Sequence, residues 1–119
     1  MIVGGFGASR ILLARGVVDM RRSFDTLAGM VRDQLGRDPL SGEAFVFVGR
    51  DRRRLKVLWW DGDGFWVCAK RLARGGFALP APALTKESRE VLTLDAASWA
   101  LLLSGMTVLT HRQSPRWRH

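Results

Sequence analysis

The hydrophobic positions of the chain fall into helix-like and strand-like patterns. Between Ser23 and Leu35, apolar residues recur at spacings that place them on one stripe of a helix; they are Phe24, Leu27, Ala28, Val31 and Leu35. Ser23 is a suitable N-cap, and Gly36 is a suitable stop after the last turn. The pattern predicts a helix over residues 23–35 whose apolar stripe is buried against a sheet.

Several short segments have the length and composition of strands. Ala44–Val48 is continuously apolar, which indicates that both of its faces are covered. Leu55–Trp60 and Phe65–Leu72 flank the turn Asp61–Gly64, whose two Asp-Gly signals predict a hairpin. The other expected strand segments are Arg10–Ala14, Glu90–Leu94 and a brief pairing at Phe77–Leu79.

A second, shorter helix is expected at Ala96–Leu103, capped by Asp95 and ended by Gly105. The elements together predict an α+β fold, with a mainly antiparallel sheet of three to five strands, one main helix packed on a face and a short C-terminal helix. We expect a flexible lead-in at 1–9, a single α+β domain at 10–105 and a basic tail at 106–119. The 119 residues suit one domain and are too few for two.

Composition excludes several classes of protein. Cys68 is the single cysteine, so an internal disulfide framework and a Cys-rich zinc site are ruled out. In a strand beside tryptophan, we expect it to be a small core residue. No apolar run approaches the roughly 20 residues that a membrane span needs, and the first residues lack the features of a signal peptide. These features lead us to expect a cytoplasmic protein.

The net charge of +8 is unevenly distributed. Residues 50–76 hold eight basic and three acidic side chains, a net +5, and the tail 111–119 adds Arg112, Arg116 and Arg118. Such a local excess favours a polyanionic partner, most often nucleic acid. The alternative is a solvated face in a protein from an arginine-rich proteome, since 16 of the 19 basic residues are arginine.

The hairpin is the expected binding surface. With 61–64 as the loop, Trp60 lies opposite Phe65 and Arg54 lies opposite Arg71. One face of the hairpin then carries these two aromatic residues at one end. The same face carries three cations, Arg54, Lys56 and Arg71, at the other end. Aromatic rings can stack on bases and cations neutralise phosphates, and we expect these cations to converge without nearby acids. The predicted nucleic-acid-binding residues are Arg52, Arg53, Arg54, Lys56, Trp60, Phe65, Lys70, Arg71 and Arg74.

Two alternatives to this surface stay open. The aromatic residues would serve as core if they point inward, with the cations extending at the rim of that core. A two-residue turn at Asp61-Gly62 would instead shift the register and re-pair every residue of the hairpin.

Catalytic motifs are scarce. Both histidines, His111 and His119, lie in the tail, so a His-based triad or metal site would have to form there. Asp61 and Asp63 form a D-x-D pair that could hold Mg²⁺ in a nuclease, although such sites usually need further carboxylates. Both aspartates are better explained as turn residues. We therefore expect no cofactor, no metal and no catalytic residue.

Several segments resemble motifs of a known family. Residues 18–27 (VDMRRSFDTL) are similar to its DMR-x-x-F-x-x-L segment, and residues 38–47 to its P-x-x-G-x-x-F-x-F segment. Residues 55–66 (LKVLWWDGDGFW) and 70–75 (KRLARG), followed by Phe77 and Pro80, are similar to its most distinctive stretch. Over residues 10–105 the chain thus resembles the TnpB accessory protein, the second open reading frame of the insertion-sequence-66 group of bacterial transposons. That family is unrelated to the RNA-guided nuclease of the same name.

The resemblance implies a non-catalytic accessory factor of DNA transposition, encoded by the mobile element beside a larger transposase that carries the catalytic acids. It implies two partners, DNA and that transposase, and it assigns no catalytic residue. The motif residues whose roles it leaves unassigned are Asp19, Arg21, Lys56, Trp59, Asp61, Gly62, Gly64, Lys70, Arg71 and Gly75. The charge distribution independently indicates a DNA-related partner.

Three functions therefore compete. The leading hypothesis is a factor that binds DNA and assists assembly of the transposase complex. The second is a module that docks on the transposase without DNA contact, in which exposed aromatic residues would be protein hot spots. The third is a small metal-dependent nuclease built on Asp61 and Asp63.

Overall fold

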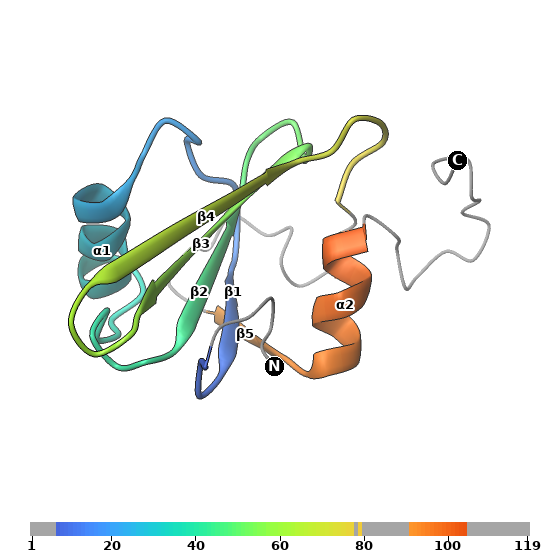
Figure 1. Cartoon of the computed structure of the whole chain (residues 1–119). Coiled ribbons are helices and arrows are strands. Elements are labelled where there is room, and N and C mark those ends of the chain that lie inside the picture. Colours follow the sequence, from blue (N-terminus) through green and yellow to red (C-terminus); the bar gives the residue numbers. More distant parts are fainter. Residues whose placement is uncertain (1–6, 78, 80–90, 105–119) are drawn as a thin grey trace.

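The computed structural model describes residues 7–77, 79 and 91–104, and the expected stop at Gly105 and the basic tail lie outside this part of the chain. The described elements are β1 (Ile11–Ala14), α1 (Phe24–Asp33), β2 (Ala44–Val48), β3 (Arg54–Trp60), β4 (Phe65–Arg71), β5 (Val91–Leu94) and α2 (Ala96–Ser104). The strands form one sheet in the order β4-β3-β2-β1-β5, with the two helices on opposite faces (Figure 1). The predicted α+β fold is confirmed.

The sheet is antiparallel except at one pair of strands. β1 and β2 run parallel, joined through α1, whereas β2–β3, β3–β4 and β1–β5 are antiparallel. A parallel pair needs a long crossover, and α1 with its flanking loops supplies it. Because β1 and β2 point the same way, the loops that follow both strands leave the sheet at the same end.

Alternate strand residues face two separate cores. On β1, Ile11 and Leu13 pack with Trp99 and Leu102 of α2, whereas Leu12 packs with the buried residues of α1. All five residues of β2 are buried, which confirms that both faces of this strand are covered. The two-residue period of a strand thus divides the apolar residues between the two helix-covered layers.

The apolar stripe of α1 is buried except at its start. Leu27 and Val31 are fully buried, Ala28 is 7% exposed, and Leu35, just beyond the helix, is also buried. The prediction was wrong for Phe24, which is 45% exposed. Phe24 is the first residue of α1, and helical side chains lean toward the N-terminus, so its ring extends past the layer that covers the sheet.

The hairpin adopts the register expected for a four-residue loop. Arg54 pairs with Arg71 and Trp60 with Phe65, so the alternative two-residue turn is excluded. The Asp61 carboxylate accepts the backbone N–H groups of Asp63 at 3.0 Å and Gly64 at 3.1 Å, which holds the loop.

The brief strand expected at Phe77–Leu79 is absent from the described elements. Phe77 donates one backbone hydrogen bond to Arg52 at 2.6 Å and is buried in the core with Leu79. The segment is therefore held chiefly by apolar packing.

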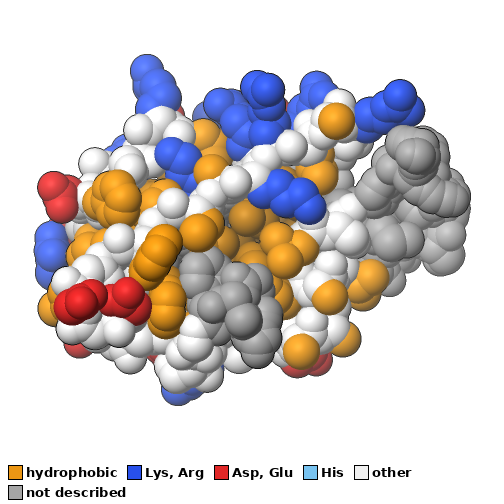
Figure 2. Space-filling view, in the orientation of Figure 1, with side chains coloured by type: hydrophobic (Ala, Val, Ile, Leu, Met, Phe, Trp, Pro, Cys, Tyr) orange, Lys and Arg blue, Asp and Glu red, His pale blue; other side chains and the backbone are white. Residues whose placement is uncertain are grey.

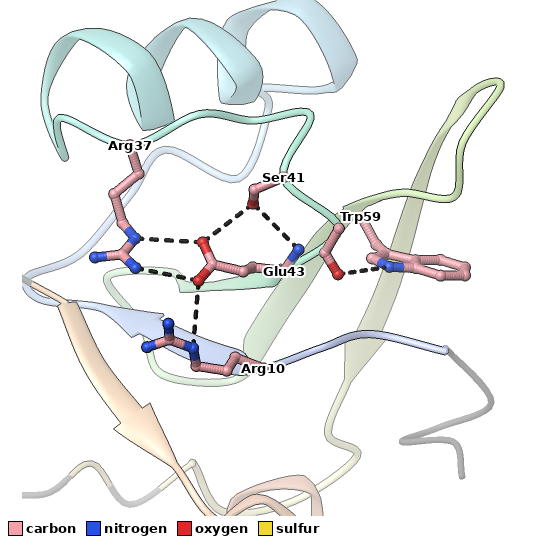
Figure 3. Close-up of polar contacts among 6 residues, drawn as sticks. Arg10, Arg37, Ser41, Glu43 and Trp59 are labelled. Atoms are coloured by element: carbon pink, nitrogen blue, oxygen red, sulfur yellow. Dashed lines mark hydrogen bonds and ion pairs between the residues drawn. The ribbon is translucent and has the colours of Figure 1, made fainter.

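A buried carboxylate fastens the connection between α1 and β2 (Figure 3). Glu43 is 8% exposed and accepts hydrogen bonds from Arg37 at 3.1 Å and Ser41 at 3.1 Å, with the Arg10 guanidinium 3.5 Å away. Burial raises the pKa of Glu43, but the hydrogen bonds from Arg37 and Ser41 and the charges of both arginines lower it further, so the net shift is downward. This cluster lies where β1 and β2 begin, at the end of the sheet opposite the loops that follow them.

Candidate nucleic-acid interface

Three segments meet at the end of the sheet where β1 and β2 finish. The loop after β1 runs beside the loop after β2, since Val18 bridges Gly49 and donates its backbone N–H to Val48 at 2.9 Å. β3 begins at this end and β4 finishes there, because both are part of the antiparallel ladder. The topology therefore gathers residues from about 17–21, 50–54 and 71–73 on one edge of the molecule.

This edge is rich in arginine. Two hollows of about 360 Å³ each lie side by side and share Arg54 in their linings. The arginines that line them, called here the arginine end, are Arg21, Arg50, Arg53, Arg54 and Arg71. Figure 2 shows Lys and Arg side chains gathered over the β2–β3 connection and the end of β4, while acidic side chains lie at the opposite end of the hairpin. Among the residues that the structure describes, two acids, Asp19 and Asp51, line the same hollows.

One of these acids corrects an expectation about the hairpin cations. Asp51 lies 3.3 Å from the Arg54 guanidinium, so the cations do not converge without a nearby acid. Asp51 also accepts the backbone N–H of Arg53 at 3.0 Å, and this bond, with the charges of Arg54 and Arg53, lowers the pKa of Asp51. Its carboxylate thus stays ionised and offsets part of the positive charge.

The second acid, Asp19, pairs with Arg21 of the arginine end. Asp19 accepts three side-chain hydrogen bonds from Arg21, the shortest at 2.7 Å, and also the Arg21 backbone N–H. These bonds lower the pKa of Asp19 and raise that of Arg21. The Arg21 side chain is still 88% exposed, so the pair holds the guanidinium in one orientation at the surface.

Two predicted cations are engaged elsewhere in the fold. The Lys56 ammonium donates to the backbone carbonyl of Arg22 at 2.8 Å and ties the loop before α1 to the sheet. The Lys70 ammonium donates to the carbonyl of Leu103 at 2.6 Å. Leu103 is in the last turn of α2, which lies on the face of the sheet opposite α1. A lysine at a helix C-terminus is favourable because it meets carbonyls that have no helical partner. Both contacts stabilise the fold.

The predicted aromatic residues are separate from the arginine end. Trp60 and Phe65 pack edge to face with ring centroids 5.0 Å apart, and Phe65 also packs against the core under α1. Trp60 lies six positions along β3 from Arg54, a distance of about 20 Å in an extended strand. The structure thus places the cations and the aromatic pair at opposite ends of the hairpin.

The remaining predicted residues are exposed in loops near the arginine end. Arg52 adopts a left-handed backbone conformation with φ of 58° and its carbonyl accepts the Phe77 N–H, while Arg74 lies in the turn after β4. The sequence prediction did not include Arg21 and Arg50. Arg21 was present in the recognised motif and Arg50 in the charge count, but only the Val18–Gly49 bridge brings their loops together.

In the D-x-D pair, the carboxylate of Asp61 is engaged in contacts within and beside the turn. Asp61 binds two backbone N–H groups and accepts the Trp66 indole N–H at 2.8 Å; these bonds lower the pKa of Asp61 to about 2. The neighbouring Asp61 carboxylate raises the pKa of Asp63. Within the described residues, no group of three or more His, Cys, Asp or Glu side chains is placed to hold a metal ion. His111 and His119 lie outside those residues.

None of the described helices has the length and apolar character required to cross a membrane.

Comparison with known proteins finds a matching protein family and two similar proteins. The family described as IS66 Orf2-like protein matches residues 9–113. Two relatives come from Sinorhizobium fredii (strain NBRC 101917 / NGR234). The uncharacterized protein y4hO is 37% identical to this chain, and the match covers 92% of this chain and 84% of y4hO. The uncharacterized protein y4jC is 30% identical, and the match covers 96% of this chain and 93% of y4jC. No solved structure matches the chain significantly.

Proposed function

Because the chain belongs to the IS66 Orf2-like family of transposition accessory proteins, we propose that it is a non-catalytic factor that binds the DNA backbone through the arginine end. The proposal places it in the bacterial cytoplasm, where it would help the transposase of the same element to assemble on DNA. It requires no cofactor and no metal ion.

The gathering of five arginines from three segments carries the proposal. The two carboxylates that line the same hollows, Asp19 and Asp51, each already accept a backbone N–H group and form an ion pair with an arginine. Guanidinium groups bind phosphate oxygens in a bidentate manner, and adjacent hollows that share Arg54 suit consecutive phosphates of one strand. Arg52 and Arg74, exposed in nearby loops, add positive charge at the rim.

The arrangement favours contact with phosphates over reading of bases. Base reading in the major groove usually needs an inserted helix or a two-stranded ribbon. The cation of α1, Arg32, pairs with Asp33 at 3.3 Å, and Asp25 lies in its first turn, so this helix is a poor recognition helix. Binding should therefore be weakly sequence-specific and strongly dependent on salt.

A second candidate function is docking on the transposase without DNA contact. Several large apolar side chains favour it by their exposure; they are Val17, Phe24, Leu40 and Trp66. Trp66 is 52% exposed beside the acidic hairpin turn, far from the arginine end. A mainly apolar interface of this kind would respond little to salt.

A titration of the protein against single- and double-stranded DNA at low and physiological salt tests the first function. We expect an affinity that falls steeply with salt for either DNA form and depends little on base sequence. Binding that is undetectable at low salt, together with salt-resistant capture of the purified transposase of the same element, would replace DNA binding by the docking function.

A further inference from the structure

β4 is an open edge of the sheet. It pairs only with β3 among the described strands, and five of its seven residues are exposed. A strand edge of this length presents unpaired backbone groups that can bind another strand. The single cysteine, Cys68, is one of the exposed residues, which corrects the expectation that it is a core residue.

Two hydrogen bonds establish which backbone groups of β4 face outward. Asp61 donates its N–H to Gly64 at 3.0 Å, and Leu72 donates its N–H to Arg53 at 2.8 Å, so both ends of the ladder are bonded pairs. Bonded and non-bonded pairs alternate in an antiparallel ladder, so the even-numbered residues between these ends bond to β3. The N–H and C=O groups that point to the open edge belong to Phe65, Val67, Ala69 and Arg71.

The charges along this edge have opposite signs at its two ends. Asp61 and Asp63 lie in the turn before β4, whereas Lys70, Arg71 and Arg74 lie at or just after its end. Figures 1 and 2 show β4 at the front of the molecule, with acidic side chains near the hairpin turn and basic ones near the other end. An antiparallel neighbour with the same charge order would place opposite charges together.

We propose that β4 of a second copy of this chain pairs with this edge, antiparallel, around a two-fold axis at Cys68. The two sheets would then form one continuous sheet through a self-complementary contact. This proposal does not depend on DNA binding by the arginine end.

The register around Cys68 is the one that uses every outward group. Phe65 bonds with Arg71 of the second copy and Val67 with Ala69, so all four outward-facing residues of each strand are paired. With a two-fold axis at Val67 or Ala69 instead, one of the four outward-facing residues would have no residue of the second copy's β4 opposite it. On the other face of the strand, Trp66 lies opposite Lys70 of the second copy, a cation beside an aromatic ring.

Cys68 supplies a direct test of the register. In a non-bonded pair of an antiparallel ladder the two Cα atoms are about 4.5 Å apart, within the range that a disulfide spans. Since the chain has one cysteine, any disulfide dimer joins Cys68 to Cys68. Mild oxidation with diamide should convert the folded full chain rapidly into a covalent dimer, and the same chain in denaturant should react much more slowly. Equal rates in the two states would contradict the register.

Backbone pairing is tested with Ala69→Pro. Proline removes an N–H group that points away from β3, so the ladder with β3 keeps its bonds while the pairing between copies is lost. Ala69→Thr keeps the N–H and is the matched control. Sedimentation equilibrium should give a dimer for the wild type and the control and a monomer for Ala69→Pro, with circular dichroism showing that all three are folded. Should Ala69→Pro unfold, Val67→Pro provides the same test from the other residue of this bonded pair.

A charge swap tests the orientation of the two copies. Asp63→Lys should weaken the dimer about tenfold, because an attractive contact becomes repulsive twice per dimer. Arg74→Asp should weaken it similarly, and the two changes together should restore the dimer. A wild-type chain that stays monomeric at about 100 µM, or a dimer that is unaffected by the proline and charge variants, would overturn the proposal.

Discussion

Arg54 and Arg71 lie directly opposite each other on β3 and β4, in a non-hydrogen-bonded pair of the antiparallel ladder, where facing side chains are closest. Like charges in this relationship repel. Asp51 relieves part of the repulsion, since its carboxylate lies 3.3 Å from Arg54. The pair therefore opposes folding slightly, and a phosphate between the two guanidinium groups would reverse the sign of the interaction.

Replacing one member of this pair should stabilise the free protein. Arg71→Thr removes the repulsion and places a β-branched residue in a strand, so the free energy of unfolding should rise by about 0.2–1 kcal/mol. Urea unfolding measures the change. The control Arg74→Thr alters an arginine in the turn after β4 and should shift stability by less than about 0.5 kcal/mol. A loss of stability in Arg71→Thr would show that Arg71 has a structural role.

Removing the charge of Asp51 should strengthen DNA binding. Asn at this position keeps an oxygen that can accept the Arg53 N–H but releases Arg54 from its ion pair. We expect the affinity of Asp51→Asn for DNA at low salt to rise severalfold, because the Asp51 carboxylate no longer competes with DNA phosphate for the Arg54 guanidinium. Asp33→Asn removes the same charge from α1, away from the hollows, and should change the affinity less. Equal gains in both variants would indicate a general charge effect.

The apolar stripe of α1 should respond to truncation according to burial. Leu27 is fully buried, so Leu27→Ala should lower the free energy of unfolding by about 2–5 kcal/mol. Phe24 is 45% exposed, so Phe24→Ala should have a clearly smaller effect although the side chain removed is larger. Thermal and urea unfolding of the two variants make the comparison. An unchanged melting temperature for Leu27→Ala would show that α1 does not cover this core.

The Glu43 cluster predicts an acid-sensitive contribution to stability. The pKa of Glu43 is lower in the folded protein than its ordinary value of 4.5, so folding favours the ionised form. The contribution is therefore complete above about pH 4.5 and is lost as the pH falls through the folded pKa. Glu43→Gln should cost about 1–3 kcal/mol at pH 7, where charged hydrogen bonds are lost, and a smaller amount at pH 3. A cost that is the same at both pH values would contradict this role.

Local patterns were sufficient to predict much of the fold. The Asp-Gly signals predicted a hairpin and favoured 61–64 as its loop, but they left a two-residue turn open. The structure decides between the two, with Trp60 opposite Phe65 and the Asp61 carboxylate accepting the backbone N–H groups of Asp63 and Gly64. The capping of α2 by Asp95 was also predictable, and the carboxylate accepts the Ser98 N–H at 2.8 Å. The parallel pairing of β1 with β2 was not predicted, because the paired positions are 33 residues apart in sequence and no local signal reports their contact.

The candidate site was less predictable for the same reason. Lys56 and Lys70 were expected on a binding surface, yet their partners are carbonyls 34 and 33 residues away in sequence. Charge counting finds cations but cannot distinguish those that stabilise the fold from those that stay at the surface. Arg21 and Arg50 were missed because only the parallel strand pair brings their loops together at one end of the sheet.

The dependence of DNA affinity on salt concentration in the double variant Arg54→Gln/Arg71→Gln tests the central claim most directly. If both guanidinium groups contact phosphates, the slope of log affinity against log salt should flatten by about two relative to the wild type, with lower affinity at low salt. Arg32→Gln, which removes a cation from α1, is the control and should leave the slope nearly unchanged. A folded double variant with the wild-type affinity and slope would contradict the account.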